Sequence, residues 1–196
     1  MFGLFAVFAL MGSEPQQNCA WDREAVLEMD AVAFDQIEGQ GWRPLYDARC
    51  YIEAAEMLRY WQAHNGASLS AENPREASLL RILKWHEAQM WGFAERNDLA
   101  LPMFERSYAK DGQAGWNLYV TGTIAFLRRD RQALEAAIAH LSALPKPAGW
   151  GRAIGQDGKP ISFPWPPNLD VLEGLNRCWD KPYVQAYLCR DISRAR

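Results

Sequence analysis

Most of the sequence signatures that identify an enzyme are missing from this chain. It contains no Cys-x-x-Cys pair, no glycine-rich phosphate-binding loop and no Gly-x-Ser-x-Gly nucleophile motif. Histidine is scarce, with His64, His86 and His140 alone. His86-Glu87 matches the first half of the His-Glu-x-x-His zinc-protease helix, but Met90 stands where the second histidine is required. We therefore expect no catalytic centre, no metal site and no bound cofactor.

An excess of basic residues is also missing. The 196 residues include 21 Lys and Arg against 24 Asp and Glu, which gives a formal charge of -3 and an isoelectric point near 5.7. The two signs are mixed along the chain, without a long run of either. Nucleic-acid binding depends on clustered Lys and Arg, so we expect no nucleic-acid partner.

One apolar run stands out at residues 1–12, and a polar stretch follows it. The run is too short to span a bilayer, but it has the length of the apolar part of a secretory signal. No Lys or Arg precedes Arg23, which departs from the usual signal pattern, so the alternative is an N-terminal helix packed into a groove of the protein. We expect residues 1–20 to be a signal peptide with a flexible segment, cleaved after Gly12. Residues 21–196 then form a single helical domain without a membrane span, periplasmic or secreted; a cytoplasmic location is the alternative.

The chain has four cysteines: Cys19, Cys50, Cys178 and Cys189. In an exported protein this even number suits two disulfides, with three possible connectivities. In a regular helix hairpin that turns near Asp180, Cys178 and Cys189 lie about 9 Å apart at about 1.5 Å per residue. A disulfide tolerates a Cα separation of up to about 6.8 Å, so this geometry favours free buried thiols for that pair.

The pattern between Arg81 and Pro145 predicts two helix-turn-helix units in tandem. In each unit, an inner helix that is apolar around most of its surface precedes an outer helix with one apolar face. The turns are expected at Asn97-Asp98 and Arg129-Asp130, and Pro145 ends the second unit. The four helices are expected at 84–93, 99–108, 116–127 and 133–141. Before them, Asp22 and Asp30 are placed to cap two helices, and a divergent helix pair follows from Trp42 to Trp61.

After Pro145 the composition changes. Between Pro145 and Pro167 the chain has six Pro and four Gly, which exclude a helix. Asp157-Gly158 is suited to turn a small hairpin inside this loop. Asn168 is placed to cap the first of two helices that form a C-terminal capping hairpin.

The two central units superpose at a constant offset of 33 residues. The matching positions are Ala88, Trp91, Asn97, Ala100 and Phe104 in the first unit and Thr121, Ile124, Asp130, Ala133 and Ala137 in the second. This pattern resembles the tetratricopeptide repeat (TPR), whose period is about 34 residues. The resemblance implies an all-α fold: a short TPR-like solenoid of helical hairpins with a Pro/Gly-rich loop (145–167) and a C-terminal capping helix hairpin. Another all-α array of stacked hairpins is the alternative.

The same resemblance implies a binding groove lined by the first helix of each unit. Carried onto this chain, the groove residues are Trp85, Gln89, Phe93, Leu118, Gly122 and Phe126. Because they are mostly apolar, they suit an apolar or extended peptide. We expect a protein- or peptide-binding helical repeat scaffold and no enzyme.

Two alternatives remain open. One is a small-molecule binder or enzyme with a pocket between the groove and the loop at 145–167. A pocket-facing cluster of His86, Glu87 and a loop residue, or a strongly perturbed carboxylate, favours it. The other is a structural subunit whose groove is filled by the chain's own segments; the N-terminal helices and the Pro-rich loop are the expected covers.

Overall fold

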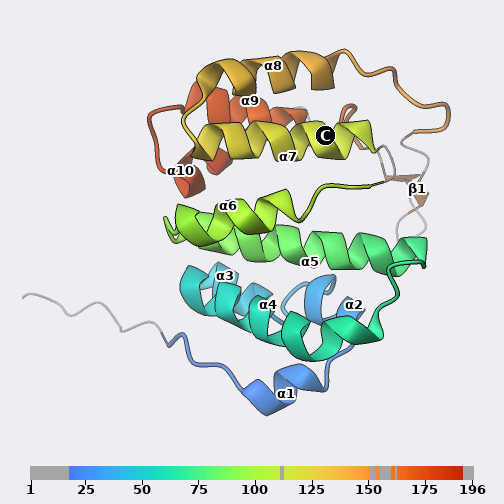
Figure 1. The fold of residues 1–196 in the computed structure, drawn as a ribbon, viewed down its shortest axis with the longest axis vertical. Coiled ribbons are helices and arrows are strands. Elements are labelled where there is room, and N and C mark those ends of the chain that lie inside the picture. Colours follow the sequence, from blue (N-terminus) through green and yellow to red (C-terminus); the bar gives the residue numbers. More distant parts are fainter. Residues whose placement is uncertain (1–17, 111–112, 151–152, 155–159, 162, 192–196) are drawn as a thin grey trace, which may run out of the picture.

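The computed structural model describes residues 18–110, 113–150, 153–154, 160–161 and 163–191, and at 153–154 and 160–161 it describes the backbone alone. The apolar run at residues 1–12 therefore lies outside the described residues. Within them the protein is almost wholly helical, with ten α-helices (Figure 1). The prediction of an all-α fold is confirmed.

The helices differ in length along the chain. Three short ones come first: α1 (Arg23–Leu27), α2 (Ala31–Asp35) and α3 (Arg43–Asp47). The longer ones follow: α4 (Tyr51–Asn65) with the 3-10 turn η1 (Gly66–Ser68), α5 (Pro74–Phe93), α6 (Asn97–Glu105), α7 (Ala114–Leu127) and α8 (Arg131–Ser142). The last elements are β1 (Ala153–Ile154), β2 (Pro160–Ile161), α9 (Leu169–Arg177) and α10 (Tyr183–Leu188).

Side-chain caps start several helices where the sequence predicts them. The carboxylate of Asp22 accepts hydrogen bonds from two backbone N–H groups at the start of α1, and Asp30 does the same for α2. The start of α5 differs from the prediction. This helix begins at Pro74, well before residue 84, because Asn73 caps it and proline is favoured in the first turn.

One type of turn joins the helix pairs α3–α4, α5–α6 and α7–α8. At each turn one residue adopts a left-handed backbone: Arg49 (φ 57°), Glu95 (φ 59°) and Arg129 (φ 60°). The next N–H bonds back to the carbonyl five residues earlier: Cys50 to Leu45 (2.8 Å), Arg96 to Trp91 (2.9 Å) and Asp130 to Ala125 (2.9 Å). At the turns, Asp130 therefore corresponds to Arg96 and not to Asn97, so the spacing there is 34 residues and not the predicted 33.

The long helices pack side by side around one core. Along the long axis of the molecule, α8, α7, α6, α5 and α4 follow one another (Figure 1). α9 contacts both α7 and α8, and α10 contacts α9 and α5. The C-terminal helices therefore lie against the first helices of the two central pairs.

Two tryptophans hold the described parts of the loop after α8 in place. The predicted hairpin is present as two short antiparallel strands, with Ala153 opposite Ile161; the turn at Asp157-Gly158 lies outside the described residues. Trp165 donates its indole N–H to the carbonyl of Leu144 (2.9 Å), and its ring lies 4.6 Å from that of Trp150.

Two disulfides link all four cysteines. Cys19–Cys50 ties the N-terminal segment to the start of α4, and Cys178–Cys189 brackets α10. The expectation of free thiols at Cys178 and Cys189 is wrong. Their Cα atoms are 6.3 Å apart, because α10 ends at Leu188 and the following residues fold back against Gly174 of α9.

Candidate functional site

The predicted groove residues lie mainly in the core. Trp85, Gln89, Phe93, Gly122 and Phe126 are all buried, and Leu118 is half-buried. Phe126 has 0% of its surface exposed. Phe93, Gly122 and Phe126 are therefore not on a free surface of the described structure.

The C-terminal helices cover this groove. The rings of Tyr183 and Tyr187 lie 5.1 Å and 5.3 Å from that of Phe93. Leu172 packs so closely on Gly122 that an added Cβ would lie 2.7 Å from its side chain. From the N-terminal side, Tyr46 of α3 also contacts Phe93, with 6.2 Å between ring centroids. The cover is thus mainly the C-terminal hairpin with a part from the N-terminal helices, and a partner cannot reach Phe93 or Gly122 in this arrangement.

Two of the predicted residues, Trp85 and Gln89, also line an open cleft beside the groove. Its other lining residues come from α3, α5, α7 and α10, from the residue after α2 and from the residue before α9. The full lining is Gln36, Arg43, Ile82, Trp85, His86, Gln89, Trp116, Tyr119, Asn168 and Tyr187, around a volume of about 320 Å³. We call this the His86 cleft.

His86 is held at the edge of the cleft by a buried carboxylate. Its Nδ1 lies 2.7 Å from Oδ1 of Asp35, which is fully buried, whereas the His86 side chain is 18% exposed. Because an ionised carboxylate only accepts hydrogen bonds, Nδ1 carries the hydrogen and Nε2 is left as the basic atom of the neutral ring. A buried carboxylate that orients an imidazole in this way is the arrangement used to position a general base.

Other groups fix Asp35 in turn. Trp42 donates its indole N–H to the same Oδ1 (2.9 Å), and Gln36 donates to Oδ2. The indole of Trp42 also packs against the imidazole, with 4.8 Å between ring centroids. The Arg43 guanidinium donates to the Asp35 carbonyl (3.1 Å from Nε) and lies over the Trp42 ring. The imidazole therefore has a single supported orientation.

The protonation state of Asp35 follows from these bonds. Burial alone would raise the pKa of Asp35, but the hydrogen bond and charge of His86, with the bonds from Trp42 and Gln36, outweigh it and hold this pKa below its ordinary value of 3.8. Asp35 is thus a carboxylate at neutral pH.

Gln89 and Asn168 add polar groups to the cleft. Gln89 is 7% exposed, and its Nε2 makes no hydrogen bond of normal geometry within the described part of the chain. Its neighbour is Tyr183, whose pKa is raised by burial and by Tyr187 and lowered by a weak, poorly aligned hydrogen bond with Gln89. Asn168 stands before α9 in a left-handed conformation (φ 64°), and it does not cap the helix as predicted. Both residues line the cleft, and their amide groups can both donate and accept hydrogen bonds.

Glu87 points to the other side of α5. It accepts hydrogen bonds from Gln62 of α4 (2.8 Å) and from the Trp91 indole (3.3 Å). Burial raises the pKa of Glu87 above its ordinary value, and the bonds from Trp91 and Gln62 only partly offset this. The enzyme alternative asked for His86 and Glu87 to face the same pocket. His86 faces the cleft, and Glu87 does not.

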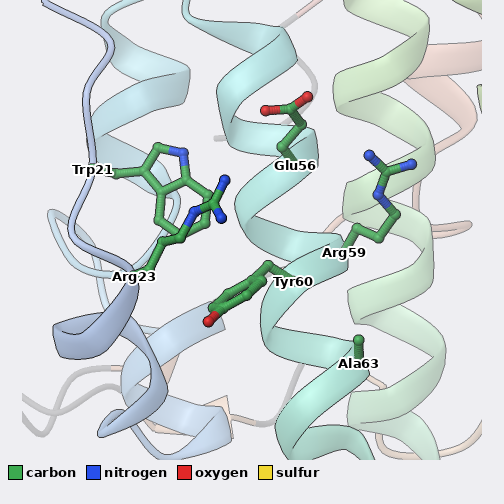
Figure 2. A pocket seen from close by; sticks show the side chains of 6 residues that line it. All are labelled: Trp21, Arg23, Glu56, Arg59, Tyr60 and Ala63. Atoms are coloured by element: carbon green, nitrogen blue, oxygen red, sulfur yellow. The ribbon is translucent and has the colours of Figure 1, made fainter.

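A second pocket lies between the N-terminal segment and α4. Figure 2 shows its lining, which consists of Trp21, Arg23, Glu56, Arg59, Tyr60 and Ala63. The guanidinium of Arg23 lies over the rings of Trp21 (5.6 Å) and Tyr60 (5.5 Å). The charged groups here are exposed and solvated, and no buried polar atom without a partner lines this pocket among the described residues. The pocket lacks the fixed polar groups of the His86 cleft.

One cluster has metal-ligand residue types among the described residues: Cys19, Cys50 and Glu53. Its two sulfur atoms form a disulfide, so they offer no thiolate to a metal ion.

Comparisons with protein-family models, with curated proteins and with solved structures find no match to this chain. In the part of the chain that the structure describes, none of the helices combines the length and the apolar character needed to cross a membrane.

Sequence reasoning found Trp85 and Gln89 but missed the partner of His86. Asp35 and His86 are 51 residues apart, and no local pattern links them. The sequence offered one weak signal, an acidic and an indole side chain, Asp35 and Trp42, on either side of the Gly-x-Gly break at 39–41.

Proposed function

We propose that this protein is a peptide-binding helical-repeat module that acts outside the cytoplasm, and that its ligand site is the His86 cleft. The module is TPR-like, and its ligand is an extended segment of a partner protein with at least one flat or aromatic side chain. The observation that carries the proposal is Gln89 in the wall of an open aromatic cleft, where its buried amide nitrogen makes no well-formed hydrogen bond to any described residue.

The repeated turns support a TPR-like arrangement. The same hydrogen bond and left-handed residue recur at the three helix junctions, and the later two junctions are 34 residues apart. That spacing equals the repeat length of about 34 residues in TPR proteins. The larger separation of the first junction is taken up by the longer α4, η1 and the connection to α5.

The shape and chemistry of the cleft favour a peptide over a small solute. Small-molecule sites bury about 70–90% of their ligand, whereas this cleft is broad and open to solvent. Amide side chains such as Gln36, Gln89 and Asn168 can pair with the N–H and C=O groups of an extended backbone. The rings of Trp116 and Tyr187 can hold a flat side chain.

The two disulfides support a location in an oxidising compartment. Disulfides persist in secreted and periplasmic proteins and are rare where thiols are kept reduced. Because both bridges are formed, the proposal includes the export of the chain and the removal of residues 1–12.

Blocking the cleft tests the proposal. Ile82 is half-buried at the cleft wall, so Ile82→Arg places a charged side chain in the opening without emptying the core. Peptides would be selected from a random phage-displayed library on the wild-type protein, and their Kd values measured by fluorescence polarisation. We expect Ile82→Arg to weaken binding at least about tenfold, which is about 1.4 kcal/mol.

The matched control is Ala63→Arg, which adds the same side chain in the pocket of Figure 2. It should leave the Kd values unchanged. A failure to select any peptide, or equal Kd values for wild type and Ile82→Arg, would contradict the proposed function.

A further inference from the structure

We propose that the His86 cleft hydrolyses carboxylic esters, with His86 as the general base that activates a water molecule. The inference rests on the proposed function in one respect, namely that the cleft is where a ligand binds. It adds a reaction and a substrate class to that site: an ester whose acyl or alcohol part is flat and apolar.

The base is the best-defined part of the site. Asp35 fixes the Nδ1–H tautomer of His86 at 2.7 Å, and Trp42 and Gln36 fix Asp35, so the basic Nε2 is the atom left for a substrate or water. The other two histidines lack such a carboxylate. His64 contacts the carbonyl of Tyr60 in its own helix (2.8 Å), and His140 is exposed on α8.

The nucleophile has to be water. None of the described residues that line the cleft is Ser, Thr or Cys. Burial raises the pKa of Tyr119 well above its ordinary value, so this phenol stays protonated and is a poor nucleophile. A histidine held by a carboxylate can accept a proton from water directly.

Gln89 supplies the second requirement, a donor for the developing oxyanion. It lies one turn after His86 on α5, lines the same cleft, and its Nε2 has no hydrogen bond of normal geometry in the described chain. Its neighbour Tyr183 interacts with it only weakly, so this donor can stabilise negative charge without first breaking a well-formed hydrogen bond.

The reaction balances without a further reagent. Nε2 of His86 takes a proton from water as the water oxygen forms a bond to the acyl carbon. The tetrahedral intermediate, with its oxyanion near Gln89, then collapses. The bond from the acyl carbon to the alkoxy oxygen breaks, and the leaving alkoxide takes the proton back from His86. The products are a carboxylic acid and an alcohol. An ester suits this site better than an amide does, because an alkoxide can leave before it is protonated, whereas an amide nitrogen has to be protonated before it can leave.

The experiment uses the full chain with both disulfides formed and p-nitrophenyl acetate and p-nitrophenyl butyrate as probes. We expect p-nitrophenol release that exceeds one equivalent per protein. H86N, which keeps a donor for Asp35, should lower kcat by about 100-fold or more, the range for losing a general base. Q89L should lower kcat about 10- to 100-fold with little change in KM, because the donor acts on the oxyanion.

H64N and H140N are the matched controls and should keep kcat within about twofold, since neither residue lies at the cleft. If H86N does not fold, as judged by circular dichroism, modification of the wild-type protein with diethyl pyrocarbonate replaces it. Mass spectrometry should then show that activity is lost in step with modification of His86.

The outcomes separate this inference from the proposed function. Binding of p-nitroacetanilide, the non-hydrolysed amide analogue, would be followed by the NMR shift of the Trp116 indole N–H. Binding without turnover overturns the hydrolysis and leaves the cleft as a ligand site. If neither binding nor turnover is observed, the use of the cleft for such ligands is overturned as well. Turnover that H86N retains, or that stops after one equivalent, overturns His86 as the base.

Discussion

Asp35 and Glu87 are both buried carboxyl groups, and their pKa values are displaced in opposite directions. Asp35 accepts hydrogen bonds from His86, Trp42 and Gln36, which outweigh the cost of burial, whereas the bonds to Glu87 do not. Asp35 therefore contributes stability above its ordinary pKa that is lost as the pH falls through its lowered pKa. The contribution of Glu87 is present below its ordinary pKa and is lost as the pH rises through its raised pKa.

Asp35→Asn should destabilise the protein mainly at neutral pH. We expect a loss of about 1.5–3 kcal/mol at pH 7, because bonds to a charged acceptor are weakened. At pH 3, below the ordinary value of 3.8, the loss should be smaller, because the contribution of the Asp35 charge falls as the pH approaches its lowered pKa. Urea unfolding at both pH values measures this, with the exposed Asp47→Asn as control. An equal loss at both pH values would contradict the role of the Asp35 charge.

Glu87→Gln should have the opposite dependence. A neutral amide can still accept from Trp91, and the Gln62 amide can turn so that its oxygen faces the new N–H group. Relative to wild type, the variant should gain stability as the pH rises above the ordinary value of 4.5. Thermal unfolding from pH 4 to pH 8 checks this, with the exposed Glu56→Gln as control. A difference that stays constant over this range would show that Glu87 does not titrate as inferred.

Two glycines of α7 should respond oppositely to alanine. At Gly122 the new Cβ would lie 2.7 Å from the Leu172 side chain, so Gly122→Ala should cost about 1–3 kcal/mol through overpacking, despite better helix propensity. At Gly115 the nearest atom is at 3.5 Å, an ordinary contact, so Gly115→Ala should stabilise by about 0.5 kcal/mol. Denaturant unfolding measures both. Stabilisation by both substitutions would mean that α9 is not packed on α7 as described.

Phe126→Ala decides whether this predicted groove residue belongs to the core. With the ring fully buried against Trp179 and Tyr183, we expect a loss of about 3–5 kcal/mol. Phe163 is 47% exposed, so Phe163→Ala should cost far less. The free energy of unfolding in urea is the readout. A similarly small loss of unfolding free energy for both variants would mean that Phe126 lies at the surface and not in the core.

The two disulfides should stabilise by different amounts. They close loops with sequence separations of 31 and 11 residues. The chain-entropy relation gives about 4 kcal/mol for Cys19–Cys50 and about 3 kcal/mol for Cys178–Cys189. Double Cys→Ser variants, compared by urea unfolding, test the order. A larger loss for the Cys178–Cys189 pair would show that this bridge acts mainly through native packing.

Local signals made much of the helical structure predictable. Asp22 and Asp30 begin helices because their carboxylates satisfy free backbone N–H groups within three residues. The start of α5 is also specified locally, by the cap Asn73 and by Pro74 in the first turn, although the sequence pattern predicts a loop at these residues. Such signals act within one turn of helix, which is why reading the sequence recovers them.

The site depended on contacts that no local signal specifies. The spacing of apolar residues shows that a helix face is buried but not which segment packs on it. The contacts of Tyr183 and Tyr187 with Phe93 could therefore not be predicted from spacing. The contact between Asp35 and His86 likewise needs α2 and α5 to meet across 51 residues. The Cys178–Cys189 bridge was misjudged because a regular hairpin was assumed where α10 is only six residues long.

The positions of the bridges also determine how the chain would extend under a pulling force applied to its two ends. The load would pass from backbone to sulfur at Cys19–Cys50 and again at Cys178–Cys189, so the loops they close would carry no tension. Between the two bridges, the stretch from Cys50 to Cys178 could then lengthen. Cutting the bridges with a reductant would release about 110 Å and about 40 Å of hidden contour length, at about 3.6 Å per residue.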